Sequence, residues 1–187
     1  CSIVTIEHFC HHISDMKKLL AIALLATTIL SCNNDEDTQF VLNYSEEFLL
    51  PATLGIEYAI STDSIAIETD SDEKFNDNET KASLINEALI TTLQVSLTGP
   101  TGKDLQYVDQ MSIYMSATGL DEILIGTIDE ADEGDVLLTL DTRDTDVQEY
   151  LKATSVSFRI EFTSDDFASQ DRNCLLNVRF SVDATKA

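Results

Sequence analysis

The 187-residue chain contains no tryptophan, and proline and glycine are scarce, with 2 and 6 copies. Aromatic residues make up only 7% of the sequence, whereas 43% of its residues are hydrophobic. Few proline and glycine residues together with many apolar ones argue against low-complexity disorder. The length and composition indicate one or at most two globular domains.

Positive charge is also scarce. The chain has 11 lysine and arginine residues against 34 aspartate and glutamate residues, for a formal net charge of −23. A surface this acidic repels phosphate backbones and anionic lipid headgroups. We therefore expect no nucleic-acid partner.

An apolar run near the N-terminus has the organisation of a signal peptide. Lys17 and Lys18 form a positive region directly after Met16, and an apolar stretch, Leu19–Leu30, follows them. The stretch is too short to span a bilayer. A buried core helix is the weaker interpretation, because only Thr27 and Thr28 interrupt the run and no polar face repeats at helical spacing. Residues 16–31 are therefore predicted to be a signal peptide.

The end of this run, Ile29-Leu30-Ser31-Cys32, resembles a bacterial lipobox. The resemblance implies that Cys32 is lipidated, that the chain is cut just before it, and that the lipid attaches the protein to a membrane. Residues 1–15 are then interpreted as a non-native upstream extension. The alternative is that this extension holds a zinc site, since thiolate and imidazole are preferred zinc ligands, built from Cys10 with His8, His11 and His12.

Cleavage before Cys32 would remove every histidine of the chain, because all three precede it. The mature protein would then lack Ser-His-Asp and Cys-His machinery and any histidine-ligated metal. Cys174 would remain as the one cysteine without lipid, and without a disulfide partner. It begins an apolar strand pattern, so we predict that it is a buried packing residue and not a nucleophile.

Residues 32–38 form a short acidic tether that includes Asp35, Glu36 and Asp37. Acidic residues just after a lipidated cysteine resemble the export signal of Bacteroidota lipoproteins. The resemblance implies an outer-membrane anchor with the protein exposed on the cell surface. The alternative is a flexible spacer on an anchor that faces the periplasm.

Alternation with a period of two dominates residues 39–187, which we predict to be a single domain. Val156, Phe158, Ile160 and Phe162 alternate with polar residues, as in a strand with one buried and one wet face. Strands are expected at 39–49, 54–60, 64–69, 92–98, 111–116, 122–128, 135–141, 155–163 and 176–183. About eight or nine short strands with one wet face each predict an all-β fold, an antiparallel β-sandwich of two sheets.

Two short helices are expected to interrupt the strands. Residues 145–148 have capping-box spacing, and Val147, Tyr150 and Leu151 share one face, which predicts a helix over 146–152. Leu84, Ile85 and Ala88 share a face after a cap-rich stretch, which predicts another near 80–88.

Calcium is the metal that this composition favours, because it takes carboxylate and carbonyl oxygens. The candidate ligands are Asp141, Asp144 and Asp146. A position at the end of a strand and a role in capping the following helix explain these three aspartates better. The other acidic clusters are explained as solvent-exposed residues of loops. We therefore expect no cofactor, with a structural calcium ion as the alternative.

Glycoside hydrolysis by two carboxylates is the enzymatic mechanism that needs no histidine. The chain offers many acids but only 5 tyrosines as platforms for sugar rings. Tyr114, on a wet strand face, could stack on a sugar, although cross-strand packing explains it better.

The segment from Asn86 to Thr127 resembles a pattern common among uncharacterised Bacteroidota outer-membrane lipoproteins predicted to be β-sandwiches, and that pattern carries no catalytic residues. Asp63-Ser64-Ile65 resembles the O-glycosylation site of exported proteins in this group, with Ser64 as acceptor. We expect a lipid-anchored envelope lipoprotein that acts as a non-enzymatic binding or structural accessory, with an envelope protein or a glycan as partner. The alternatives are a surface glycan-binding protein and, less favoured, a histidine-free glycoside hydrolase.

Overall fold

Regular alternation of side chains produces most of the strands in the computed structural model, which describes residues 36–55, 58–164 and 166–187. These residues belong to one compact unit, Glu36–Ala187. The predicted extension (1–15), the signal peptide (16–31), Cys32 and the zinc candidates lie outside the described residues.

The first sheet has four antiparallel strands in the order β1-β12-β5-β8. The two strands β1 and β12 pair in one unbroken register from Asp37↔Thr185 to Leu50↔Arg172. The strands are β1 (Asp37–Leu50), β12 (Arg172–Thr185), β5 (Ile85–Gly99) and β8 (Leu137–Thr139).

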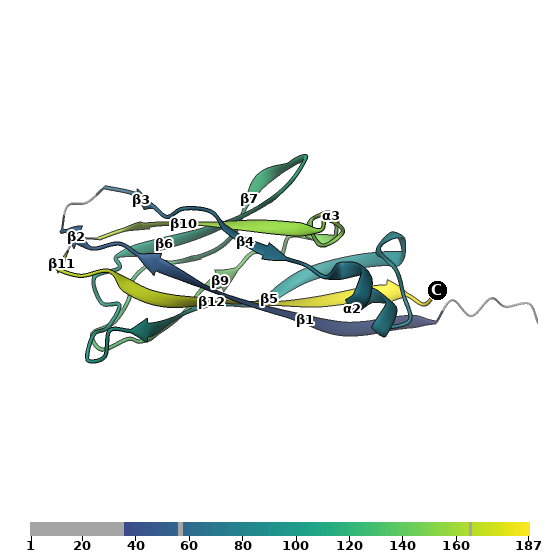
Figure 1. Cartoon of the computed structure of the whole chain (residues 1–187), viewed down its shortest axis with the longest axis horizontal. Coiled ribbons are helices and arrows are strands. Elements are labelled where there is room, and N and C mark those ends of the chain that lie inside the picture. Colours follow the sequence, from purple (N-terminus) through teal and green to yellow (C-terminus); the bar gives the residue numbers. More distant parts are fainter. Residues whose placement is uncertain (1–35, 56–57, 165) are drawn as a thin grey trace, which may run out of the picture. The chain divides into compact units, whose positions relative to one another are not determined.

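The second sheet has six strands in the order β3-β10-β6-β7-β9, with β4 also paired to β10. Its strands are β3 (Ile60–Ser61), β4 (Ile65–Glu68), β6 (Gln110–Ala117), β7 (Leu120–Ile128), β9 (Asp141–Thr142) and β10 (Ser155–Thr163). A separate pair, β2 (Thr53–Leu54) with β11 (Phe167–Ala168), lies at the end of the domain away from the first residue of β1 (Figure 1).

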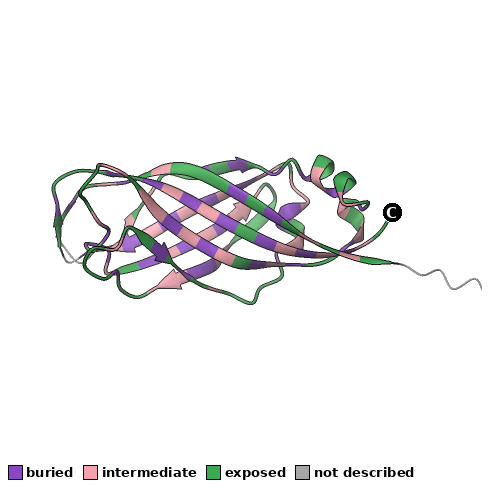
Figure 2. Cartoon of the chain, turned by 90° about the horizontal axis from the view of Figure 1, so that it is seen from below, coloured by how far each residue is buried: buried purple, intermediate pink, exposed green. Residues whose placement is uncertain are grey.

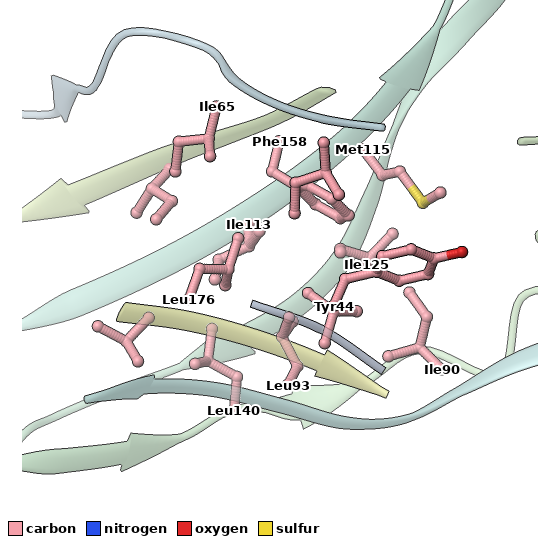
Figure 3. Close-up of a cluster of buried hydrophobic side chains, with 14 of the residues drawn as sticks. Tyr44, Ile65, Ile90, Leu93, Ile113, Met115, Ile125, Leu140, Phe158 and Leu176 are labelled. Atoms are coloured by element: carbon pink, nitrogen blue, oxygen red, sulfur yellow. The ribbon is translucent and has the colours of Figure 1, made fainter. Parts of the chain in front are cut away.

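The core lies between the two sheets. Along β10 and β12 buried residues alternate with more exposed ones, as Figure 2 shows for the strands seen from below. Figure 3 shows side chains from both sheets meeting, among them Leu93 and Leu176 from one sheet and Ile113 and Phe158 from the other. The all-β, two-sheet sandwich predicted from the sequence is confirmed, with more strands than expected because several are only two or three residues long.

One lateral side of the sandwich is closed by the chain itself. Strand β8 of the first sheet leads through the buried Leu140 directly into β9 of the second. Gly126 on β7 lets the sheets approach here, because a Cβ at this position would lie 2.6 Å from Leu93 Cδ2 and 3.1 Å from the Asp141 carbonyl oxygen.

The helix predicted over 146–152 is confirmed as α3 (Gln148–Leu151), with Val147, Tyr150 and Leu151 buried. The helix predicted near 80–88 is wrong. That segment forms a three-residue 3-10 turn, η1 (Ala82–Leu84), and then enters β5, where Ile85 and Ala88 are core residues. The acidic stretch before it forms a helix instead, α2 (Ser71–Asp77), which buries Phe75.

Two predicted strands are broken in the structure. The strand expected at 54–60 is not continuous, because β2 ends at Leu54 and β3 begins only at Ile60. The strand expected at 135–141 divides into β8 and β9, since the chain changes sheet between them. Within the described ranges, no helix has the length and hydrophobicity needed to cross a membrane.

Candidate functional site

The lateral side opposite the β8–β9 crossover carries a groove of about 460 Å³. It lies between the second half of β1 and the segment that joins β3 to β4. The residues that line it come from these two stretches and are Glu46, Glu47, Phe48, Leu49, Thr62, Asp63, Ser64, Ile65 and Ala66. We call it the edge groove.

The edge groove exists because the outer strand of the second sheet is interrupted. Both β3 and β4 pair with β10, but Thr62–Ser64 between them belongs to neither strand. Within this segment Thr62 still bonds to β10, because its amide donates to the Ile160 carbonyl at 2.9 Å and its hydroxyl oxygen accepts from the Ile160 amide at 3.2 Å. Glu46 and Phe48 of β1 therefore face a gap in the opposite sheet, and neither is fully buried.

On one side of the gap the two sheets are tied together by Tyr44. Its hydroxyl donates a 2.7 Å hydrogen bond to the carbonyl of Thr69, just after β4. Burial, with a smaller effect of the Asp70 charge, raises the pKa of Tyr44 to about 12, so the phenol stays protonated. The edge groove begins on the C-terminal side of this contact along β1.

Strand β1 presents unpaired backbone groups to the edge groove. The Glu36 carbonyl accepts a 2.9 Å bond from the Lys186 amide, so residues 36 and 186 form a hydrogen-bonded pair. Bonded and non-bonded pairs alternate along an antiparallel ladder, so even-numbered β1 residues bond to β12. Glu47 and Leu49 direct their N–H and C=O away from β12, and β1 has no second strand partner among the described residues.

The edge groove combines an acidic rim with apolar walls. Glu46, Glu47 and Asp63 are exposed, whereas Ile65 is buried. Glu46 also breaks the pattern of its strand, because the even-numbered residues around it, Tyr44 and Phe48, pack toward the core. An acidic side chain on the inward register of an edge strand discourages pairing with unsuitable strands. The local chemistry favours a partner that is extended, cationic and partly apolar.

The calcium candidates Asp141, Asp144 and Asp146 do not come together as a metal site. Within residues 36–187 as described, no three acidic, cysteine or histidine side chains are grouped to hold a metal ion. Asp146 instead joins two elements, because its Oδ1 accepts from the amides of Ala88 and Gln148, each at 3.0 Å. Burial works against the ionised form, but these hydrogen bonds dominate and lower the pKa of Asp146.

The capping residue of α3 differs from the prediction. The amide of Gln148, the first residue of the helix, donates to Asp146 Oδ1 and not to Thr145, and the Gln148 side chain also donates to Asp146 Oδ2 at 2.6 Å. Val147 occupies the N-cap position without a side-chain capping bond, and Asp146, one residue before it, accepts from the first amide of the helix.

Three carboxyls of the described residues, Glu122, Asp146 and Asp183, have pKa values shifted downward by their hydrogen bonds. A hydrogen bond from Arg159 lowers the pKa of Glu122, and hydrogen bonds from Gln39 and Asn86 lower the pKa of Asp183. A general acid requires a shift in the opposite direction. Cys174 is fully buried, as predicted, and burial raises its pKa to about 12, which leaves little thiolate at neutral pH.

Tyr114 takes the structural role that the sequence favoured for it. The Arg159 guanidinium carbon lies 4.2 Å from the centre of the Tyr114 ring, and the two residues pair across β6 and β10. Arg159 is held there by bonds of 2.7 Å to Glu122 and 2.9 Å to Glu161. One face of the ring is therefore covered, while the other tyrosines are buried (Tyr44, Tyr107, Tyr150) or lie in a loop (Tyr58).

A second hollow, of about 380 Å³, lies on the outer face of the four-stranded sheet. Its polar side chains are amides, hydroxyls and one guanidinium, without a carboxylate, and they are Asn43, Ser45, Thr92, Gln94, Asn177 and Arg179. Ser45 donates to Asn177 at 2.7 Å, and Gln94 donates to Thr139 at 3.1 Å. This surface carries no acid and one positive charge, in a chain with a net charge of −23.

Sequence reasoning singled out one stretch of the edge groove, Asp63-Ser64-Ile65, and missed the residues of β1. Ser64, the glycosylation candidate, is exposed and lines it. Glu46 was not singled out, although the sequence holds a signal for it. In the run Leu42-Asn43-Tyr44-Ser45-Glu46-Glu47-Phe48, an acid occupies a position where alternation calls for an apolar residue.

The chain matches no family model and no curated protein. Solved structures with a similar fold include that of infectious bursal disease virus Gt strain, at 11% identity and TM-score 0.39, where the match covers 81% of this chain but 34% of the viral one. The decameric BFDV capsid protein matches at 10% identity and TM-score 0.38, covering 81% of this chain and 100% of that one. CpGH89CBM32-5 from Clostridium perfringens, in complex with GalNAc-beta-1,3-galactose, matches at 11% identity and TM-score 0.33, covering 71% and 94%. Likeness at this level assigns no function to the chain.

Proposed function

We propose that this protein is a lipid-anchored, non-enzymatic binding module of a bacterial cell envelope that recognises a partner protein at the edge groove. The observation that carries the proposal is the open lateral side of the sandwich. There, unpaired backbone groups of β1 and the half-buried Phe48 adjoin a hollow of about 460 Å³. Backbone groups at a free sheet edge are a common means of binding another chain.

The non-enzymatic part of the proposal is supported by the state of the ionisable groups. The carboxyls of Glu122, Asp146 and Asp183 have lowered pKa values and serve as partners in structural hydrogen bonds. Cys174 is buried with a raised pKa. The three carboxyls are thus engaged in hydrogen bonds within the protein, and the thiol is shielded from solvent.

The anchor is proposed from the sequence. The lipobox-like run before Cys32 and the acidic tether support attachment of the chain to the outer membrane with the domain exposed on the cell surface, and attachment facing the periplasm is the alternative. Strand β1 begins at Asp37, only a few residues after Cys32, and the edge groove lies toward the other end of that strand. The binding site would then be held away from the membrane surface.

Site-specific photo-crosslinking in intact cells tests the partner. A photoreactive amino acid replaces Leu49, which is 54% exposed beside the edge groove, and in a matched control it replaces Leu137, which is 47% exposed on the far edge strand β8. We expect a discrete protein adduct from position 49 alone, with the linked peptide identified by mass spectrometry. Equal labelling at both positions, or none at either, would contradict a partner at the edge groove.

The carboxylate-free hollow on the four-stranded sheet supports a second candidate function, binding of a glycan. Amide, hydroxyl and guanidinium groups hydrogen-bond sugar hydroxyls, and Arg179 could also pair with an acidic sugar. A glycan array probed with the full chain tests this function, with Arg179→Ala as the variant expected to lose the signal. An array without hits would remove this candidate.

Glycosylation of Ser64 competes with the main proposal. A sugar on Ser64 would occupy the wall of the edge groove and obstruct it. Mass spectrometry of the protein from its native envelope would show whether the Ser64 hydroxyl is free, as partner binding requires.

A further inference from the structure

We infer that the edge groove binds its partner by strand addition: an extended segment with a basic residue two positions from an apolar residue pairs with the free edge of β1. This inference rests on the proposed function and specifies the chemistry of the partner.

The first step is the direction of the backbone groups. The fixed register with β12 leaves the N–H and C=O of Glu47 and Leu49 pointing into the open side. Two consecutive outward-facing residues on one strand can accept and donate four hydrogen bonds to an added strand. The inward-facing residues between and beside them, Glu46 and Phe48, then define what side chains that strand needs.

The second step is the spacing of the partner's side chains. Residues two apart on a strand point to the same face, so the partner residues opposite Glu46 and Phe48 enter the edge groove together. The carboxylate of Glu46, with Asp63 on the opposite wall of the edge groove, requires a lysine or arginine at one position. Phe48 and the buried Ile65 require an apolar residue at the other.

The third step excludes a second copy of this chain as the occupant. Two β1 edges paired with each other would bring the acids of one copy against those of the other, in a chain with a net charge of −23. Like charges placed opposite each other across strands are destabilising. Charge complementarity therefore selects a cationic segment of a different protein.

Fluorescence anisotropy with the full chain in detergent tests strand addition. The probe is a short labelled peptide in which threonine alternates with lysine and valine, prepared in both sequence directions because strands can add parallel or antiparallel. We expect saturable binding of at least one direction. The same peptide with glutamate in place of lysine should bind at least about tenfold more weakly.

Proline substitutions separate backbone pairing from simple surface contact. Leu49→Pro removes an outward N–H and leaves the ladder to β12 intact, so we expect about tenfold weaker binding of the lysine peptide. Val41→Pro is the matched control, since Val41 has the same outward register on β1 but lies outside the edge groove. It should bind the peptide like the unmodified chain.

Peptide N-methylation gives the same test without altering the protein. Two peptides are compared, one with its odd-numbered and one with its even-numbered amides methylated. Binding should be abolished in the peptide whose methylated amides face β1 and retained in the other. Equal binding by the two methylated peptides would overturn strand addition. Glu46→Lys should invert the preference, so that the glutamate peptide binds more tightly than the lysine peptide.

The outcomes separate this inference from the proposed function. If Leu49 crosslinks a partner in cells but the peptides do not bind, or bind without regard to Leu49→Pro, the partner is recognised in another way and strand addition is wrong. If neither crosslinking nor peptide binding occurs, the proposed function fails as well.

Discussion

Tyr44 connects the two sheets through a hydrogen bond, and its burial makes the free energy of unfolding decrease at alkaline pH. Its hydroxyl bonds to the Thr69 carbonyl, and its pKa is raised from 10.0 to about 12. Because this pKa is higher in the folded state, the phenol of the unfolded chain ionises first as pH rises. The contribution of Tyr44 to the free energy of unfolding is therefore complete below pH 10 and is lost as pH rises toward 12.

We therefore predict that the free energy of unfolding falls by about 2–3 kcal/mol between pH 10 and 12 through Tyr44, as measured by urea denaturation. Tyr44→Phe should lower stability by roughly 1 kcal/mol at pH 7, because the Thr69 carbonyl loses its donor, and should show a smaller alkaline loss. Burial raises the pKa of Tyr107 too, so some dependence remains in the variant. An unchanged alkaline slope in Tyr44→Phe would show that the phenol does not cause it.

Gly126 is needed for space and not for backbone conformation. A Cβ there would meet Leu93 Cδ2 at 2.6 Å, inside the core where β7 and β5 approach each other. We predict that Gly126→Ala destabilises the domain by about 1–3 kcal/mol through overpacking.

Gly102→Ala is the matched comparison, because Gly102 has open space around it and a φ of +75°. It should cost only the strain of that conformation, about 1 kcal/mol. Thermal unfolding of both variants measures the difference, and Leu93→Ala should partly rescue Gly126→Ala but not Gly102→Ala. Failure of Leu93→Ala to rescue Gly126→Ala would contradict steric crowding at Gly126.

At the scale of the element, β1 is an exposed edge strand that uses acids against self-association. Glu46→Val would give its inward register a continuous apolar run with Tyr44 and Phe48, so we predict concentration-dependent dimers or larger species by analytical ultracentrifugation. Glu47→Val changes the same edge but points to the other face, and should remain monomeric under the same conditions. If both variants behave alike, the inward position of Glu46 has no special role.

The alternating strands could be predicted from the sequence because one face of each is buried by the sandwich. Strands expected at 155–163 and 122–128 are β10 and β7 with nearly the same bounds. The helix expected near 80–88 is wrong because the spacing of its apolar residues is also compatible with a strand. In the structure Ile85 and Ala88 belong to β5 and pack into the core. Local spacing did not decide between the two structures, but packing in the core did.

The edge groove could not be predicted from local pattern. It depends on which strands end each sheet and on the interruption of the outer strand at Thr62–Ser64, both of which follow from pairing between distant segments. Residues 46–49 and 62–66 meet only once β1 has paired with β12 and β4 with β10. The sequence supplied single residues of the site, such as Ser64, without their arrangement.

For the whole molecule, the main prediction concerns the anchor. Cys32→Ala should move the protein from the membrane fraction to the soluble fraction and abolish incorporation of radiolabelled palmitate, because lipidation requires that thiol. Cys174→Ala is the control, since Cys174 is buried in the core and should leave fractionation unchanged. Protease treatment of intact cells then distinguishes surface exposure from a periplasmic position. A membrane-bound Cys32→Ala protein would contradict the lipobox interpretation.

Strand β1 links the N-terminal tether to the edge groove, which has a mechanical consequence. If the chain is held at its N-terminus while a partner pulls at residues 46–49, tension runs along this one strand. That tension is carried by the covalent backbone of β1, and the hydrogen bonds to the added strand, which lie perpendicular to β1, are the ones loaded in shear, whereas the ladder from Asp37↔Thr185 to Leu50↔Arg172 only keeps β1 in place. The same strand would bind the partner and bear the load, and the core between the sheets would be spared.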